Sequence, residues 1–207
     1  MRDNAEGSRS SSRLNLSHWQ RSVLVGTLLG DGCLAKHGHW HRLHVKHKLA
    51  HRVLAEFKRN VFRNVVSMQL HEFDQRIRGK RYPCVQFATR THPVFTEWHS
   101  RFYRERRKVV PEEIDRWMTP LAVAVWFMDD GAADHWGVTF QTHSFEEGEV
   151  ERLGAVFSER FALTPNLRRN RDRWILYVPA SNMTRFRGIL RPHLLPEFEY
   201  KVATRSS

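Results

Sequence analysis

Two aspartates stand at equivalent places in two similar stretches of the sequence, and they are the first candidates for chemistry. Asp31 follows the apolar stretch 23–30, and Asp130 follows the apolar stretch 121–128, with Asp129 directly before it. Each stretch predicts a buried helix. An acidic side chain in the last turn of a helix opposes the helix dipole, whereas a bound divalent cation would be favoured there. Carboxylates beside free helix-end carbonyls, such as that of Gly30, form the hard oxygen site that Mg²⁺ prefers.

Glycines accompany both aspartates and allow two interpretations. Gly32 and Gly131 directly follow the acids, and the ordinary interpretation is that each ends its helix in a left-handed conformation. Gly26 and Gly30 lie four residues apart on one face of the first helix, where a second helix could approach closely. If the two helices pair about a pseudo-two-fold axis, the two aspartates lie side by side. That geometry suits metal-assisted phosphodiester hydrolysis, and the duplication favours it over a simple helix stop.

The segments after each aspartate also repeat. Together with the helix that ends at the aspartate, they give the order α-β-β-α-β-β-α in each half. In the first half we expect a hairpin over 34–46, a helix from His51, a hairpin pairing 68–73 with 84–89, and a helix over 93–103. In the second half we expect a strand region over 136–143, a helix opened by a capping box of Ser144 and Glu147, a hairpin pairing 165–169 with 174–179, and a helix over 182–190. This predicts an α+β fold with two four-stranded antiparallel sheets, each covered by helices on one face. The expected segments are a flexible basic tail (1–13), a first repeat (14–110) and a second repeat (111–207).

Composition narrows the class of partner. The chain has 207 residues and is 41% hydrophobic and 12% aromatic, so wholesale disorder is excluded. Its net charge is +12. Two cysteines exclude a disulfide framework and a four-cysteine zinc site. The longest apolar run has eight residues (121–128), against ~20 for a membrane span. Residues 1–110 hold 22 Lys and Arg against 8 acids, a net of +14. The basic half indicates a polyanionic partner, nucleic acid first, with no membrane, and an intracellular protein, cytoplasmic or organellar.

The two motifs and their surroundings resemble the double-motif LAGLIDADG homing endonucleases. The matching segments are Leu24–Gly32, Thr119–Gly131, Lys46–Lys48, Thr91–Phe95, Lys108–Pro111, Thr142–Phe145, Leu195–Pro196 and Tyr200–Lys201. In the second motif the small-residue positions hold Val125 and Asp129, so we expect Ala122 and Ala124 to support the helix contact instead.

The resemblance implies a monomer that cuts both strands of a long, asymmetric double-stranded DNA site. It implies Mg²⁺, with Mn²⁺ as a substitute, bound between Asp31 and Asp130, and the full expected ligand set adds Gly30 and Asp129. It also implies one basic residue in each half of the active site, at Lys108 and Lys201. Such a lysine would polarise the attacking water or neutralise charge that develops on the phosphate.

The open faces of the two sheets are the expected DNA-binding surface, because alternate strand residues share a face. Arginine and glutamine are the side chains that make bidentate contacts with guanine and adenine. The candidates are Arg42, His44, Lys46, Arg78, Lys80, Arg81, Gln86 and Arg90 in the first half, and Thr139, Gln141, His143, Arg168, Arg169, Arg171 and Arg173 in the second.

Six histidines crowd residues 37–51, at His37, His39, His41, His44, His47 and His51. Contacts with the DNA groove or phosphates are the favoured interpretation, and a zinc site is the alternative, although no cysteine pair accompanies them.

Three functions from different classes are compatible with the fold. The first is a site-specific DNA endonuclease, and the second is an RNA maturase that binds intron RNA. The third, a DNA-binding regulator without catalysis, is disfavoured because both aspartates are present.

Overall fold

The structure, a computed structural model, describes residues 14–203, so the expected tail over residues 1–13 lies outside the described residues. The first half contains α1 (His18–Leu29), β1 (Cys33–His37), β2 (Trp40–Lys48), α2 (Arg52–Val61), β3 (His71–Ile77), β4 (Lys80–Ala88), α3 (Pro93–Phe102), β5 (Tyr103–Arg104) and β6 (Arg107–Lys108). The second half contains α4 (Pro120–Asp130), β7 (Gly131–Asp134), β8 (Gly137–Phe140), α5 (Glu147–Phe161), β9 (Asn166–Asn170), β10 (Arg173–Val178) and α6 (Met183–Leu190). Short 3₁₀ helices connect these elements.

Each half forms one four-stranded antiparallel sheet, which confirms the predicted α+β fold. The strand orders are β1-β2-β4-β3 and β7-β8-β10-β9, so the two sheets share one topology. In the first sheet α2 and α3 pack on one face, and in the second α5 packs against β9 and β10. Phe87 on β4 and Phe140 on β8 are fully buried on these covered faces. The opposite face of the first sheet carries polar residues such as Lys46 and Gln86, as the alternation predicts, whereas that of the second sheet mixes Arg168 with the buried Ile175 and Tyr177.

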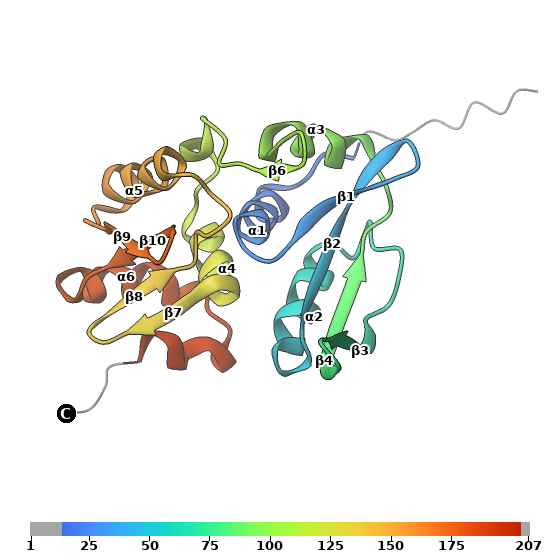
Figure 1. The fold of residues 1–207 in the computed structure, drawn as a ribbon. Helices are drawn as coiled ribbons and strands as arrows, with labels where there is room; N and C mark the ends of the chain where they lie inside the picture. Colours follow the sequence, from blue (N-terminus) through green and yellow to red (C-terminus); the bar gives the residue numbers. More distant parts are fainter. Residues whose placement is uncertain (1–13, 204–207) are drawn as a thin grey trace, which may run out of the picture.

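The helices α1 and α4 lie side by side between the two repeats (Figure 1). Ser17 and Thr119 cap their N-termini by accepting hydrogen bonds from Gln20 N and Ala122 N. A Cβ on Gly26 would lie 2.8 Å from the Val125 Cβ and closer still to the Ala122 carbonyl oxygen. The close approach expected at Gly26 is therefore present, and Ala122 contributes to it as expected. The expectation for Ala124 is wrong, because the side chains that meet Gly26 and Gly30 are those of Val125 and Asp129.

The glycines that follow the aspartates differ from the prediction. Neither adopts a positive φ, and Gly131 has φ −79° and ψ 145°. At both positions a side chain is excluded because there is no space for a Cβ. A Cβ on Gly32 would collide with the Thr27 side chain, and one on Gly131 would collide with the Phe127 ring. These glycines let the chain turn tightly against the helix end.

The hairpins, the cap of α5 and the start of β7 also differ from the expectations. The β3–β4 and β9–β10 hairpins extend nearly to their turns, where Arg78 and Arg171 have positive φ values of 48° and 59°. The capping box of α5 is formed by Glu146 and Glu149, not by Ser144 and Glu147. β7 begins directly after α4, earlier than the strand region predicted from residue 136. Within the described residues, no helix has the length and apolar character that a bilayer span requires.

Candidate active site

Three carboxylates meet where α1 and α4 end. Asp130 is the last residue of α4, and Asp31 lies in the turn between α1 and β1. The Asp31 backbone N–H donates a 3.3 Å hydrogen bond to Asp129 Oδ2, which ties the two motifs together. The Asp31 side chain is 49% exposed, whereas that of Asp129 is fully buried. The site therefore offers an exposed carboxylate from one repeat beside acids from the other.

The electrostatics of Asp130 suit a bound cation. Burial, followed by the nearby charges of Asp31 and Asp129, raises the pKa of Asp130 to about 7. Within residues 14–203, no side chain pairs with the Asp130 carboxylate. A carboxyl group that is destabilised as an anion and has no partner is the kind of group that a divalent cation would stabilise. The donor set of this site, made of carboxylate and carbonyl oxygens, fits Mg²⁺ or Mn²⁺.

Asp31 has the opposite environment. Burial opposes its ionisation, but the nearby His47, Lys58 and Lys108 outweigh that effect and lower the pKa of Asp31. Asp31 is therefore ionised at neutral pH and available to a cation.

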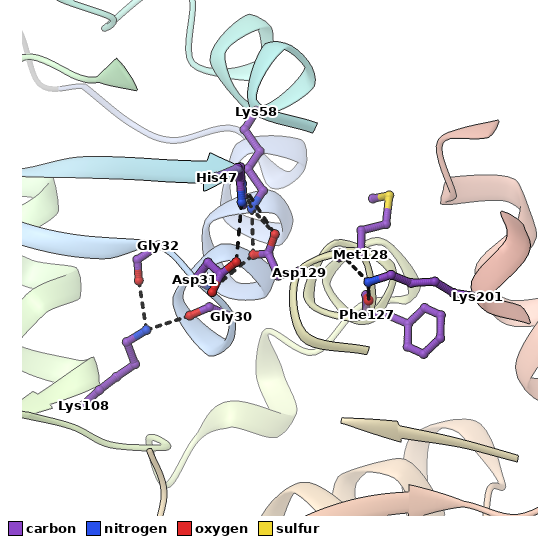
Figure 2. Close-up of polar contacts among 10 residues, drawn as sticks. All are labelled: Gly30, Asp31, Gly32, His47, Lys58, Lys108, Phe127, Met128, Asp129 and Lys201. Atoms are coloured by element: carbon purple, nitrogen blue, oxygen red, sulfur yellow. Dashed lines mark hydrogen bonds and ion pairs between the residues drawn. The ribbon is translucent and has the colours of Figure 1, made fainter. Parts of the chain in front are cut away.

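His47 and Lys58 belong to this site, although the sequence analysis assigned neither to it. Both Asp129 carboxylate oxygens accept hydrogen bonds from Lys58 Nζ, at 2.6 and 2.7 Å. Lys58 Nζ also lies 3.3 Å from His47 Nε2, and His47 Nδ1 lies 3.5 Å from Asp31 Oδ2. Figure 2 shows these four side chains converging from α2, β2, the end of α4 and the turn that follows α1. Asp129 is thus held in a buried ion pair.

The sequence feature that could have identified His47 and Lys58 as site residues is that each lies at an apolar position of its element. His47 has the strand parity of Leu43 and Val45, which face the core, and Lys58 lies one turn after buried Leu54 on α2. Burying a polar side chain on an apolar face is unfavourable unless it finds a partner, so these two positions indicated that partners exist. The partner of Lys58, Asp129, comes from the other repeat, and a local sequence pattern does not show it.

Lys108 and Lys201 lie on either side of the acid cluster and contact the helix ends. Lys108 Nζ, from β6, donates hydrogen bonds to the Gly30 and Gly32 carbonyls at 2.8 and 2.9 Å. Lys201 Nζ, from the 3₁₀ helix Pro196–Val202, donates to the Met128 carbonyl at 2.8 Å. Figure 2 shows the two ammonium groups at the ends of different helices. The site is therefore built with one lysine for each half.

Burial lowers the pKa of both lysines; Cys33 and the three aspartates partly oppose this effect for Lys108, and the three aspartates oppose it for Lys201. An ammonium group that is only partly solvated thus lies at the C-terminal end of each motif helix. Such a charge is well suited to stabilise an oxyanion that develops nearby.

The first sheet presents much of the expected DNA-binding set on its open face. Register pairs Lys46 with Gln86 and His44 with Ala88, so these residues share the face opposite to buried Phe87. The remaining candidates are placed as follows: Arg42 and Lys80 share this face, Arg78 lies in the β3–β4 turn, Arg90 is exposed beyond β4, and Arg81 lies on the other face, 3.9 Å from Asp74.

The second sheet engages several of its candidates in internal contacts. Thr139 is only 5% exposed. The Arg168 guanidinium lies 3.2 Å above the Tyr177 ring and pairs with Asp134 at 3.1 Å. Arg169 faces the Trp174 ring on the covered side of the sheet. The other candidates, Gln141, His143, Arg171 and Arg173, keep exposed or half-exposed surface.

The histidines of residues 37–51 do not gather into one ligand set. Among residues 14–203, the only group of His, Cys, Asp or Glu that could share a metal ion is Asp31, His47 and Asp129. His41 stacks on His99, and His51 contacts Phe198. His44 lies 3.2 Å from Gln86 on the open face, while His37 and His39 are exposed near the β1–β2 turn.

Comparisons with known proteins agree with this architecture. Residues 21–186 match the model of the LAGLIDADG DNA endonuclease family. The chain is 27% identical over 188 residues to cytochrome b mRNA maturase bI2 of Debaryomyces hansenii, covering 87% of this chain and 72% of the maturase. It is 24% identical over 197 residues to probable intron-encoded endonuclease 1 of Wickerhamomyces canadensis, covering 90% and 85%.

A solved structure has the same fold. The homing endonuclease I-WcaI bound to its DNA recognition sequence superimposes with a TM-score of 0.86 at 24% identity. The match covers 93% of this chain and 89% of that one. The two-sheet architecture is therefore shared over nearly the whole chain.

Proposed function

The chain belongs to the LAGLIDADG DNA endonuclease family, and from that membership we propose that it is a site-specific endonuclease that cuts both strands of double-stranded DNA. The observation that carries the proposal is the meeting of Asp31 and Asp130 at the ends of two packed helices, with Lys108 and Lys201 on either side. Two acids and two lysines, one of each from either repeat, provide one half-site for each DNA strand. Because one chain supplies both halves, we propose that it acts as a monomer.

A divalent cation, Mg²⁺ with Mn²⁺ as a substitute, would be held by Asp31 and Asp130. When bound, it would supply Lewis acidity at the scissile phosphate and lower the pKa of bound water. The Gly30 carbonyl already accepts from Lys108, and Asp129 is paired with Lys58. Asp31 and Asp130 are therefore the first of the proposed ligands.

The chain's own side chains would perform the remaining tasks. Asp31 and Asp130 fix where the cation stands relative to the two helices. Lys108 and Lys201 place positive charge beside the phosphate, where charge increases in the transition state. The open sheet faces, with Lys46, Gln86 and Gln141, would bind the duplex and place the scissile bonds over the acids.

Plasmid cleavage tests the proposal. The target is first selected from a randomised duplex library by the parent protein and then cloned into a plasmid. With Mg²⁺ the parent should convert supercoiled plasmid to the linear form. Asp31→Asn and Asp130→Asn should abolish linearisation while binding the target nearly as well without metal, because an amide of the same shape cannot hold the cation.

Asp115→Asn is the matched control, because it removes an exposed acid from a 3₁₀ helix outside the acid cluster. It should cut like the parent. If both active-site amide variants linearise the plasmid at the parent rate, the assignment of Asp31 and Asp130 is wrong.

A second function, assistance of intron splicing, is favoured by the similarity to the maturase of D. hansenii. This function needs RNA binding and does not need phosphodiester hydrolysis by the acids. A splicing assay with a defined set of candidate intron RNAs would distinguish splicing assistance from DNA cleavage. Asp31→Asn should leave splicing assistance intact while DNA cleavage is lost.

A further inference from the structure

The two repeats differ at three positions that meet in space. At the motif helices Gly30 corresponds to Asp129. Strand register pairs Cys33 with His44 and Ala132 with Thr139, so three residues further along the chain His47, on β2, corresponds to Thr142, two residues beyond the end of β8. Eleven residues beyond these, Lys58 on α2 corresponds to Leu153 on α5.

The three differences compensate one another. Asp129 is an acid where the first motif has glycine, and its buried carboxylate is neutralised by Lys58. In the pseudo-symmetric half of the site, Gly30 takes the place of the acid, and the position of Lys58 is occupied by the fully buried Leu153. Thr142, the counterpart of His47, donates its hydroxyl to the Trp174 carbonyl and takes no part in an acid cluster. The polar set is thus confined to one half of a pseudo-symmetric site.

The Lys58 ammonium occupies the position that a cation would take in this set. It lies 2.6 and 2.7 Å from the two Asp129 oxygens and 3.3 Å from His47 Nε2. The ligand atoms of Asp31, His47 and Asp129 all lie within 4.8 Å of one another, a spacing at which they could share a metal ion. The side chains of Lys58 and Asp129 are both fully buried, so neither charge is screened by water.

The ammonium also orients His47. An ammonium group donates and has no lone pair, so His47 Nε2 accepts and the imidazole proton stands on Nδ1. That nitrogen is buried, has no hydrogen-bond partner within the described residues, and is directed toward Asp31 Oδ2 at 3.5 Å.

We propose that Lys58 is a resident cation that fills a latent metal site formed by Asp31, His47 and Asp129. Asp129 then holds Lys58 instead of a catalytic metal, and His47 is a positioning residue for Asp31. Residues of both repeats form this site, and it has no counterpart in the other half of the pseudo-symmetric arrangement, where Gly30, Thr142 and Leu153 stand at the equivalent positions. The consequence of this resident cation for DNA cleavage rests on the proposed function. Because the Lys58 ammonium permanently occupies the latent site, Asp31 and Asp130 are left to bind the exchangeable metal ion.

Removing the ammonium should expose the latent site. In Lys58→Met the buried Asp129 loses its counter-ion, so without metal the variant should melt at a lower temperature than the parent. Carboxylate and imidazole together suit Co²⁺, whose visible absorption reports its ligands. We expect metal-free Lys58→Met, titrated with Co²⁺ without DNA, to bind one more ion per chain than the parent. Its melting temperature should rise more with Co²⁺ than that of the parent, because the ion binds the folded state.

Two further variants make the test specific. Adding His47→Ala to Lys58→Met should remove the imidazole absorption and the additional Co²⁺. Lys58→Leu with Asp129→Gly reproduces the pattern of the second repeat and should fold without gaining an ion. If Lys58→Met is unfolded in EDTA, Co²⁺ should refold it.

The proposal fails if folded Lys58→Met binds no additional Co²⁺, if unfolded Lys58→Met does not recover with Co²⁺, or if the additional ion persists without His47. None of these measurements depends on DNA cleavage, so they remain decisive if the endonuclease proposal is wrong.

Discussion

Gly30 and Asp129 meet face to face at the contact between α1 and α4. A Cβ on Gly30 would lie 2.5 Å from Asp129 Oδ2 and 2.6 Å from its Cβ. The first motif therefore needs a glycine at the position where the second motif has an acid. This relationship explains the departure at Asp129 that the sequence shows. It also places the buried ion pair with Lys58 on the seam between the repeats.

Gly26→Ala should destabilise the protein at this seam. The added methyl would lie 2.8 Å from the Val125 Cβ and would collide with the Ala122 carbonyl. Alanine improves helix propensity by ~1 kcal/mol, but overpacking at a rigid helix contact typically costs 1–3 kcal/mol or more, so a net loss is expected. Thermal unfolding measures the change.

Gly188→Ala on α6 is the matched control, because nothing lies within 4 Å of the added Cβ. It should leave the melting temperature unchanged or raise it slightly. A Gly26→Ala variant as stable as the control would show that the two helices tolerate a wider separation.

Much of the fold was predictable because its signals are local and occur twice. Apolar stretches ending in acids, alternating strands and the order of elements each appear in both halves, and the repeat confirms what a single copy leaves ambiguous. The predicted convergence of Asp31 and Asp130 depended on Gly26 and Gly30, whose small size shows directly in the sequence.

The remaining features depend on contacts between distant segments. The ion pair of Lys58 with Asp129 joins residues from different repeats, and no local pattern encodes it. The sequence predicts that Gly32 adopts a left-handed conformation, but glycine is required there because a Cβ would collide with the Thr27 side chain. Arg168 was expected to face DNA, yet Tyr177 and Asp134 engage it because strand alternation gives a side chain's face and not its neighbours.

DNA binding should depend strongly on salt, with the first sheet contributing much of the dependence. Replacing Arg42 and Lys46 by alanine should reduce the slope of log K against log salt by about 2, since each phosphate contact releases about one counterion. Fluorescence anisotropy at several salt concentrations gives the slope. Arg160→Ala with Arg185→Ala removes the same charge from exposed positions on α5 and α6. An equal reduction in that control would mean that the effect reflects net charge alone.

Asp130→Asn should stabilise the metal-free protein in a manner that depends on pH. The pKa of Asp130 is raised from 3.8 to about 7, so between these values the folded state binds more protons than the unfolded state. The stability contributed by the protonated form is present below about pH 4 and is lost as the pH rises through 7.

The amide does not ionise, so its advantage in melting temperature over the parent in EDTA should grow from pH 4 to pH 8. We expect at least ~2 °C at pH 8, the shift that about 1 kcal/mol produces in a chain of this size. Asp115→Asn should show no such trend, and an advantage that stays constant with pH would contradict the raised pKa.

Lys108 and Lys201 should act on different DNA strands. Each lysine is bound to the end of a different motif helix, Lys108 at the Gly30 carbonyl and Lys201 at the Met128 carbonyl. Methionine keeps the length of the side chain but removes the charge beside one phosphate. We expect each single variant to slow one strand's cleavage by ~10²-fold, the usual effect of losing one charge-stabilising donor, while the other strand is cut nearly normally.

Nicked circular plasmid should therefore accumulate with Lys108→Met and with Lys201→Met, and strand-specific end labels should place the two nicks on opposite strands. The double variant should leave the plasmid mostly supercoiled. Each change also removes a donor from buried carbonyls, so melting temperatures must be compared and the assay run well below them. Nicks on the same strand in both variants would rule out one lysine for each half-site, as would direct conversion to linear plasmid without a nicked intermediate.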